Sequence, residues 1–371
     1  MSASRFVVIG GCFAGLLTAL SIGAAQAPRR ILLPREAVAC SDCELRLERE
    51  AILGLDSGRF VSYPISVASD SRRRTYVAVQ PPGDLVLVFD SAGRFIRHIG
   101  AKGRTLGQFQ FPVWIAPGPN DSLRIFDFAT ASETVTDADW KPVRSQRGGT
   151  PTLVWRDDAL RAVTFPAAAR QPGWVNLVHL AGDDGQPTAS MHAVRETDSL
   201  AIRYLPRVAA GSRGTVWTAS PTGYVVRQWD ARGTLISEFT RRPSWLDRPM
   251  PMSDGIRGHA PSPRIWDIRE DHAGRLWILT GVAANDWRQG LGEPVVQRGA
   301  TYYDNTNRSK LFDSVIDVVD VTSGRLLVSQ RIAANLQFLL PDARIAAYRE
   351  TDTGTRLIDL WRARFTTLKP E

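Results

Sequence analysis

The segment Ile268-Arg-Glu-Asp-His-Ala-Gly-Arg-Leu-Trp277-Ile278 joins an aliphatic residue to a large side chain nine positions later through a polar turn. The same arrangement recurs at residues 67–77, 115–125 and 208–218. Each turn is rich in Asp, Gly, Ser or Arg, and short apolar runs separated by such residues are typical of strands joined by tight turns. The constant spacing therefore predicts a repeated β-hairpin. Its ninth position holds Tyr76, Arg124, Trp217 and Trp277.

A second hairpin signature follows each of these segments about a dozen residues later. Leu87-Val-Phe-Asp-Ser-Ala-Gly-Arg-Phe-Ile96 matches residues 226–236, and residues 318–327 carry one extra turn residue. In the second unit Asp139-Trp140 inverts the order of Trp229-Asp230. Two successive hairpins make a four-stranded antiparallel unit, which is one blade of a β-propeller.

The repeats predict an all-β fold, a six-bladed β-propeller of four-stranded antiparallel blades. The expected blades cover residues 60–100, 107–148, 150–195, 200–240, 262–332 and 335–365, and the third is degenerate. The strand Glu44–Gly54 is expected to pair with the last blade and close the ring, which removes an exposed sheet edge. Phe365–Leu368 competes for that position, and the sequence leaves the choice open.

The first 27 residues have the pattern of a secretory signal peptide. Arg5 is followed by an apolar run, and Ala25-Gln26-Ala27 has the small-residue form that signal peptidase cleaves. The expected organisation is a signal peptide (1–27), an N-terminal segment with the closing strand (28–59) and the propeller (60–371), in a secreted or periplasmic monomer. The alternatives are an uncleaved membrane anchor and a lipoprotein attached through Cys12.

Cys40 and Cys43 are the cysteines that remain after cleavage, and an even number in an oxidising compartment predicts a disulfide. A redox site would need a helix N-terminus, and haem attachment would need His in place of Glu44. The formal net charge of +8 raises the possibility of nucleic-acid binding. The basic residues are scattered except for Arg72-Arg73-Arg74, so export favours a solvated basic surface with no nucleic-acid partner.

Ligands of propellers usually sit over the central channel, where the innermost strands begin. The residues that precede the leading aliphatic of each readable repeat should meet there, and they are Ser66, Trp114, Arg207 and Asp267. A Trp, an Arg and an Asp together would form a small-ligand site through stacking and charge pairing. The alternative is that Arg207 and Asp267 pair with each other and Trp114 fills the channel.

The sequence offers little evidence for catalysis or for a metal, and no cofactor is predicted. Calcium needs six or more oxygen ligands, and only Asp267 is acidic among the aligned channel positions. The five histidines occupy different elements, although His179 and His192 could form a pair across a hairpin at the surface. Two long insertions, Arg241–Pro263 and Gly281–Lys310, are either functional loops or surface excursions.

Residues 100–116 carry the sequence's clearest family signature. Gly100-Ala-Lys-Gly-Arg-Thr-Leu-Gly-Gln-Phe109-Gln-Phe-Pro-Val-Trp-Ile-Ala116 resembles the NHL repeat, with its Gly-Gln-Phe, two spacers, Pro and an aliphatic-Ala strand. The layout of the chain is similar to bacterial secreted six-bladed propellers with an N-terminal C-x-x-C. This resemblance implies the fold and the compartment, whereas propellers host both binding modules and enzymes.

Three functional hypotheses follow. The first is an extracytoplasmic binding or scaffold module whose ligand is an unknown protein, small molecule or glycan. The second is a hydrolase or lyase at the channel mouth, because metal-dependent lactonases resemble this fold. The third is recognition of an acidic glycan through the Arg-rich surface, including Arg72-Arg73-Arg74.

Overall fold

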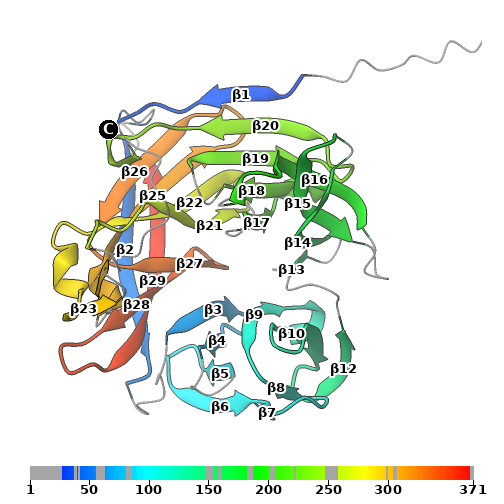
Figure 1. Ribbon diagram of the computed structural model, residues 1–371, viewed down its shortest axis with the longest axis vertical. Coiled ribbons are helices and arrows are strands. Elements are labelled where there is room, and N and C mark those ends of the chain that lie inside the picture. The colour runs from blue at the N-terminus through cyan, green and yellow to red at the C-terminus, as the bar shows by residue number, and fades with distance from the viewer. Residues whose placement is uncertain are drawn as a thin grey trace, which may run out of the picture.

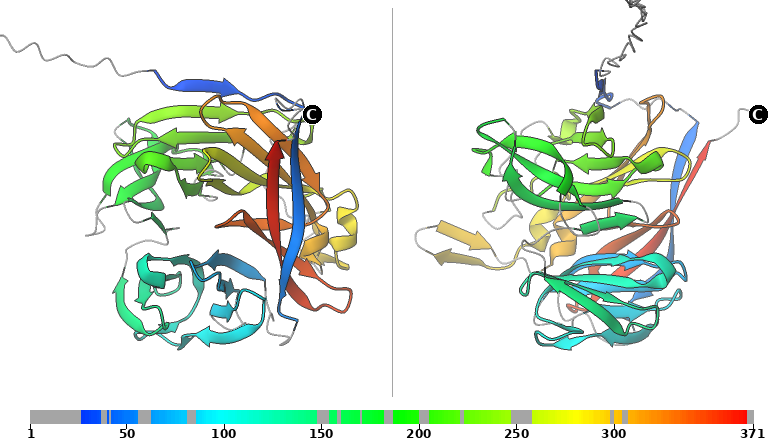
Figure 2. Two further views of the ribbon diagram at one scale, coloured as in Figure 1. Left: turned by 180° about the vertical axis from the view of Figure 1, so that it is seen from behind. Right: turned by 90° about the vertical axis from the view of Figure 1, so that its right-hand side faces the viewer.

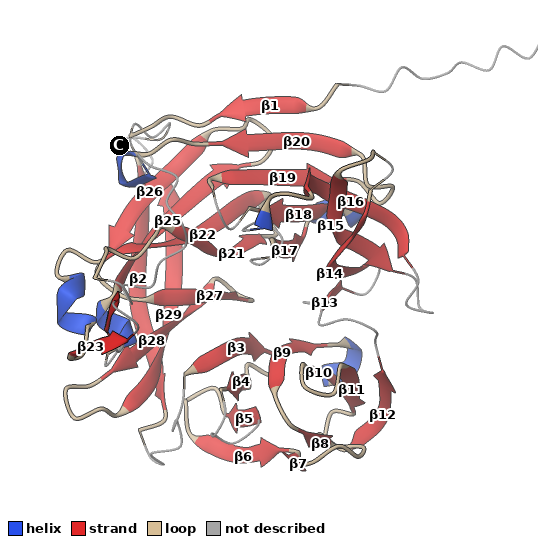
Figure 3. Cartoon of the chain, in the orientation of Figure 1, coloured by secondary structure: helices blue, strands red, loops and turns tan. Residues whose placement is uncertain are grey.

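The computed structural model describes residues 27–36, 40, 42–55, 63–80, 86–147, 154–157, 160–169, 171–181, 187–199, 205–220, 223–246, 258–297, 300–303 and 307–367. The predicted signal peptide, apart from Ala27, lies outside these residues. Strands dominate the described chain, and its helical segments are short 3-10 turns (Figure 3). These turns are η1 (Pro119–Asp121), η2 (Ser212–Gly214), η3 (Ser244–Leu246), η4 (Trp287–Gly290) and η5 (Arg308–Lys310).

Five of the sheets have four antiparallel strands, as in propeller blades (Figure 1). In four of them the strands follow sequence order from the innermost strand outward, and in the fifth the N-terminal strand β2 is outermost. Each sheet is named here after its innermost strand. The β3 sheet contains β3 (Pro64–Ser69), β4 (Thr75–Val79), β5 (Val86–Phe89) and β6 (Phe95–Ile99). The β9 sheet contains β9 (Pro112–Pro117), β10 (Leu123–Asp127), β11 (Ser132–Thr136) and β12 (Pro142–Arg147). The β13 sheet contains β13 (Val154–Asp157), β14 (Leu160–Ala168), β15 (Trp174–Ala181) and β16 (Pro187–Arg195).

The other two four-stranded sheets carry the insertion and the chain ends. The β21 sheet contains β21 (Arg264–Glu270), β22 (Arg275–Ala283), β25 (Phe312–Asp320) and β26 (Leu326–Ile332). The β27 sheet contains β27 (Leu336–Leu340), β28 (Arg344–Glu350), β29 (Arg356–Thr367) and β2 (Cys43–Leu53). Two small two-stranded sheets join β7 (Ala101–Lys102) to β8 (Gln108–Phe109) and β23 (Pro294–Gln297) to β24 (Ala300–Tyr303).

The β17 sheet has five strands, so the expectation that every blade has four is wrong here. Its core is β17 (Arg207–Ala210), β18 (Val216–Ala219), β19 (Val225–Trp229) and β20 (Leu235–Thr240), and β1 (Arg29–Leu32) pairs with β20 in parallel. Ile31 and Leu33 pack into the core of this sheet, and Leu33 is 2% exposed. The added strand covers an edge that would otherwise leave backbone groups unpaired.

The innermost strands form a closed ring. Contacts run in sequence order from β3 to β9, β13, β17, β21 and β27, and then back to β3. Hydrophobic clusters fill the spaces between neighbouring sheets, such as the cluster that joins Val77 and Phe89 of the β3 sheet to Ile358 of the β27 sheet. The chain is therefore an all-β propeller whose inner strands surround a central channel.

The N-terminal strand pairs with the last blade, as predicted. β2 runs antiparallel to β29 from Cys43 opposite Thr367 to Leu53 opposite Ile358, and the two strands lie side by side in Figure 2. The competing assignment of Phe365 to the outer edge is wrong, because Phe365 belongs to β29 and faces Leu45. The predicted disulfide is present between Cys40 and Cys43, with the Cα atoms 5.4 Å apart.

The repeated hairpins have the register that their spacing predicts. Val67 faces Val77, and Ile115, Val208 and Ile268 each face the residue ten positions later. Two of the turns contain the same hydrogen-bonded device. Asp70 accepts bonds from the Arg74 amide and guanidinium and from the Tyr76 hydroxyl, and Asp271 does the same for Arg275 and the Trp277 indole.

Candidate functional site

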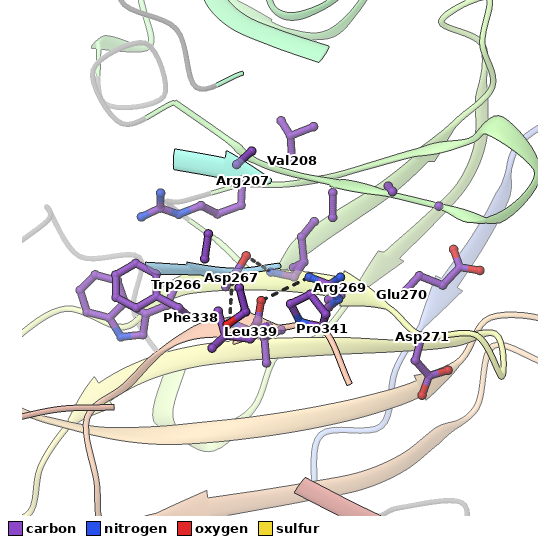
Figure 4. Close-up of a pocket in the computed structure, with 18 of the residues that line it drawn as sticks. Arg207, Val208, Trp266, Asp267, Arg269, Glu270, Asp271, Phe338, Leu339 and Pro341 are labelled. Carbon is purple, nitrogen blue, oxygen red and sulfur yellow. Dashed lines mark hydrogen bonds between the residues drawn. The ribbon is translucent and has the colours of Figure 1, made fainter. Parts of the chain in front are cut away.

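The channel contains a cavity of about 1440 Å³. Its wall is built by β3, β9, β17, β21 and β27, so the cavity lies along the axis of the ring. Figure 4 shows Arg207 and Trp266 at one side of this pocket, with Glu270 and Asp271 toward the other. Cavities of this size hold small organic ligands or short polymer segments.

All four residues that the sequence assigns to the channel mouth line this cavity: Ser66, Trp114, Arg207 and Asp267. Whether they bind a ligand stays a prediction. The structure adds Phe338 to this set. Leu339 faces Ile345 in β28 as Val67 faces Val77 in the β3 sheet, so Phe338, one residue before Leu339, is the equivalent of Ser66 and lines the cavity. The repeat spacing did not reveal Phe338 because the turn between β27 and β28 is shorter than in the other sheets.

Ser66 and Asp267 have a structural role in addition to lining the cavity. Ser66 Oγ accepts the amide of Ile115 in the next sheet at 3.2 Å. Asp267 Oδ2 accepts the amide of Leu339 in the next sheet at 2.8 Å, and Oδ1 accepts the amide of Ile268 at 2.9 Å. Both side chains therefore fasten one innermost strand to its neighbour.

Arg207 has no comparable structural partner. Within the described residues its guanidinium donates no hydrogen bond and forms no direct ion pair, although it lines the cavity. Burial lowers the pKa of Arg207 from its ordinary value, and the charge of Asp267 opposes this shift. No direct ion pair joins Arg207 and Asp267 within the described residues, although the two charges act on each other, and the Asp267 oxygens accept backbone amides. A partly dehydrated cation facing a cavity attracts anionic groups.

The charges around Asp267 are mainly positive. Burial raises the pKa of the Asp267 carboxyl to about 6, while the Leu339 amide and the charges of Arg207 and Arg269 act in the opposite direction. Arg264 lies close enough to Arg207 to lower its pKa further. Asp267 is thus outnumbered by the three arginines of this local cluster, Arg207, Arg264 and Arg269.

Aromatic side chains contribute much of the apolar wall, namely Tyr63, Trp114, Trp266 and Phe338. Trp266 lies directly over Gly281, where an added Cβ would approach the indole nitrogen to 1.9 Å. The Arg264 guanidinium lies 4.2 Å from the Trp266 ring centroid, so a cation covers the ring while its Nε1 edge meets Gly281. A side chain at position 281 would collide with Trp266, so Gly281, the first residue of the predicted insertion, allows Trp266 to take its place in the cavity wall.

The insertion Gly281–Lys310 begins in β22, forms η4, the β23–β24 hairpin and η5, and ends before β25. The hairpin projects from the body of the propeller (Figure 2). At its base Arg308 lies 4.9 Å over the ring of Tyr63, which lines the cavity. The other insertion approaches it, because Gly258 lies against Tyr303. Both insertions therefore reach the same side of the β21 sheet.

The remaining candidate residues occupy structural positions. His179 hydrogen-bonds Ser190, and His192 hydrogen-bonds Thr218 of the neighbouring sheet at 2.9 Å. The predicted surface pair of His179 and His192 is wrong, since each is 2% exposed and burial lowers the pKa of His192 to about 3. Nowhere in the described ranges do three His, Cys, Asp or Glu side chains gather as a metal site requires.

The basic triplet is not an open positive patch. Arg72 pairs with Asp121 at 2.8 Å, Arg73 with Glu50 at 3.0 Å, and Arg74 with Asp70 at 2.5 Å. The first two pairs join the turn between β3 and β4 to η1 and to β2, and the third lies within the turn. The glycan hypothesis therefore loses the surface on which it chiefly rested.

No protein-family model matches the sequence, and no curated protein matches it. Solved structures match the fold. A Bacteroides fragilis protein described as exported is matched with a TM-score of 0.57 and 10% identity, over 92% of this chain and 100% of that one. A DUF4221 family member from Bacteroides vulgatus has a TM-score of 0.57 and 9% identity, over 88% and 99%.

A gluconolactonase from Xanthomonas campestris is also matched, with a TM-score of 0.44 and 15% identity over 90% of this chain and 95% of that one. At these identities the likeness shows the fold alone. The chain therefore falls among the β-propellers. Within the described residues no helix is long and apolar enough to cross a membrane.

Proposed function

We propose that the protein is a binding module that holds a small organic anion with an aromatic or other planar group in the channel. The observation that carries this proposal is Arg207, a cavity-lining cation without a hydrogen bond or ion pair in the described chain. Arg forms strong paired hydrogen bonds with carboxylate, sulfonate and phosphate groups. Trp114 and Phe338 line the same cavity and offer apolar surface for the rest of such a ligand.

The binding role is favoured over the channel-mouth hydrolase or lyase by what surrounds Arg207. The nearest carboxylate, Asp267, already accepts two backbone amides, so it is committed to holding β21 against β27. The remaining groups near Arg207 are cations and aromatic rings, which recognise a ligand without activating a nucleophile.

We also propose that the propeller has six blades of the NHL-like type and acts outside the cytoplasm. The β17 sheet supports the sixth blade, since its four antiparallel strands have the same order as in the other sheets and β1 adds to its outer edge. The signature Gly-Gln-Phe supports the family likeness: Gln108 accepts the amides of Arg104 and Thr105, and Phe109 packs over Gly100. Export is supported by the Ala25-Gln26-Ala27 pattern, the disulfide and the neighbour described as exported.

Binding of naphthalene-2-sulfonate, measured by calorimetry and tryptophan fluorescence, tests the channel site. We expect saturable binding by the wild type and at least about tenfold weaker binding by Arg207→Gln, because a charge-assisted hydrogen bond contributes about 1.5–3 kcal/mol. Arg213→Gln is the matched control, since Arg213 lies on the same cavity wall in the exposed turn η2. Equal affinities for the wild type and Arg207→Gln would refute the proposal, as would equal affinity for neutral naphthalene-2-methanol.

The same binding should depend on pH through Asp267. The carboxyl is largely neutral below its pKa of about 6, which removes a negative charge beside the bound anion. A sulfonate stays ionised throughout, so its affinity should rise about three- to tenfold between pH 7.5 and pH 5. Asp267→Asn should flatten the profile while the variant remains folded by circular dichroism. A profile that keeps its slope in Asp267→Asn would assign the titration to another group.

A further inference from the structure

A recurring contact unites the buried residues at the ninth position of the repeats. Each side chain donates a hydrogen bond to a carboxylate. Tyr76 bonds to Asp70 at 2.7 Å, Arg124 to Glu133 at 2.5 Å, Trp217 to Glu270 at 2.6 Å and Trp277 to Asp271 at 2.9 Å. The acceptor lies in the same hairpin for Tyr76 and Trp277, in the third strand of the sheet for Arg124 and in the next sheet for Trp217. It is a carboxylate in each case.

Arg344 is the equivalent residue of the β27 sheet, because it precedes Ile345 as Tyr76 precedes Val77. It differs from the other four in lacking such an acceptor. Its side chain is 1% exposed, and its Nε and Nη2 atoms have no hydrogen-bond partner within the described residues. Buried guanidinium groups are normally paired, so this one calls for an anion.

Two further arginines lie beside it. Arg73 Nη2 donates to Glu50 Oε2 at 3.0 Å, and Arg362 Nε donates to Glu50 Oε1. Both oxygens of Glu50 are therefore already engaged. Arg344 is within electrostatic reach of two arginines, Arg73 and Arg362, and of two carboxylates, Glu50 and Asp342, but it donates no hydrogen bond to either carboxylate within the described residues. The Nε atom of Arg73 is also buried without an acceptor.

We propose that Arg73, Arg344 and Arg362 form a binding site for a small tetrahedral oxyanion, inorganic phosphate or sulfate, at the seam where β2 closes the ring. The anion would accept the hydrogen bonds that a carboxylate accepts in the other sheets. Arg344 forms the buried floor, and the side chains of Arg73 and Arg362, which are 40% and 29% exposed, form the side open to solvent. None of the three lines the channel cavity, so this site is independent of the proposed function.

Titration of the full-length mature protein with inorganic phosphate tests this site, with calorimetry and the thermal unfolding midpoint as readouts and sodium chloride of equal ionic strength as the control. We expect saturable binding and a raised midpoint for the wild type. Arg73→Gln should weaken phosphate binding at least about tenfold, and it is a suitable variant because Arg73 is partly exposed. Arg344→Met should abolish binding.

Arg364→Gln serves as the matched control, because Arg364 is an exposed arginine of β29 outside the cluster, and it should bind phosphate as the wild type does. Phosphate binding that is lost in Arg207→Gln and kept in Arg73→Gln would place the anion in the channel and overturn the proposal. A folded wild type without saturable binding at millimolar phosphate would overturn the proposal. A midpoint that rises equally in the wild type, Arg73→Gln and Arg344→Met would also overturn it, because it would show the general stabilisation by excluded salts. In that case Glu50 and Asp342 neutralise the cluster without a bound anion.

Discussion

Replacing Arg241 by Met is expected to lower the free energy of unfolding by about 3–5 kcal/mol, because it leaves the buried Asp317 carboxylate with the Tyr224 hydroxyl but without its cation. Arg241 and Asp317 are 1% and 0% exposed, and Arg241 Nη1 lies 2.7 Å from both Asp317 oxygens. The other guanidinium nitrogens donate to the carbonyls of Pro34 and Arg35, each at 3.0 Å. This one side chain therefore joins the end of β20, the β21 sheet and the N-terminal segment. Urea unfolding followed by circular dichroism gives the measurement.

Two variants make this expectation specific. Arg364→Met removes an ion pair with Glu48 whose side chains are 60% and 53% exposed, so it should cost no more than about 1 kcal/mol. The double variant Arg241→Met/Asp317→Leu should recover part of the loss, since it removes the stranded charge. If Arg241→Met lowers the free energy of unfolding no more than Arg364→Met does, the buried pair contributes no more to stability than an exposed pair.

Trp217→Ala should be comparably destabilising, by about 3–5 kcal/mol, because it opens a cavity in the core between the β17 and β21 sheets. The Trp217 side chain is fully buried and packs against Phe239 with ring centroids 5.7 Å apart. Its indole donates to Glu270 of the β21 sheet at 2.6 Å. The change therefore removes packing and leaves the Glu270 carboxylate with one bond fewer.

Trp217→Phe separates the two contributions. It keeps most of the ring but removes the indole N–H, so a cost of about 1–3 kcal/mol is expected from the lost hydrogen bond. The same urea titration compares both variants with the wild type. A Phe variant as unstable as the Ala variant would mean that the bond to Glu270, and not the packing, holds the two sheets together.

The sequence predicted the propeller well because its repeats encode hairpin geometry directly. A constant spacing between Ile268 and Trp277 and its copies fixes a register, and the register survives in the structure. The channel residues followed from the same spacing, since one position in each repeat must reach the axis. Ser66, Trp114, Arg207 and Asp267 were brought together for that reason.

Other features could not be predicted because they depend on contacts between repeats. The pairing of β1 with β20 joins residues about 200 positions apart and leaves no periodic trace. His192 was expected at the surface, but its left-handed backbone, with φ at 59°, accompanies a break in the pairing of β15 with β16, and its ring is buried against Thr218. Phe338 was missed because a short turn interrupts the spacing. Arg72 and Arg73 pair with Asp121 and Glu50 of other segments, which the sequence could not show, whereas Arg74 pairs with Asp70 of its own turn.

The pairing of β2 with β29 has a consequence for biogenesis. More than 300 residues separate the paired positions of β2 and β29, so β2 is synthesised long before its partner. The ring cannot close before β29 has been synthesised, and such long loops are slow to close. If the chain is exported, as we propose, the edge of β2 stays unpaired until β29 has crossed the membrane, and an open ring suits passage through a narrow translocation pore. Closure of the ring would then wait for the transport of β29.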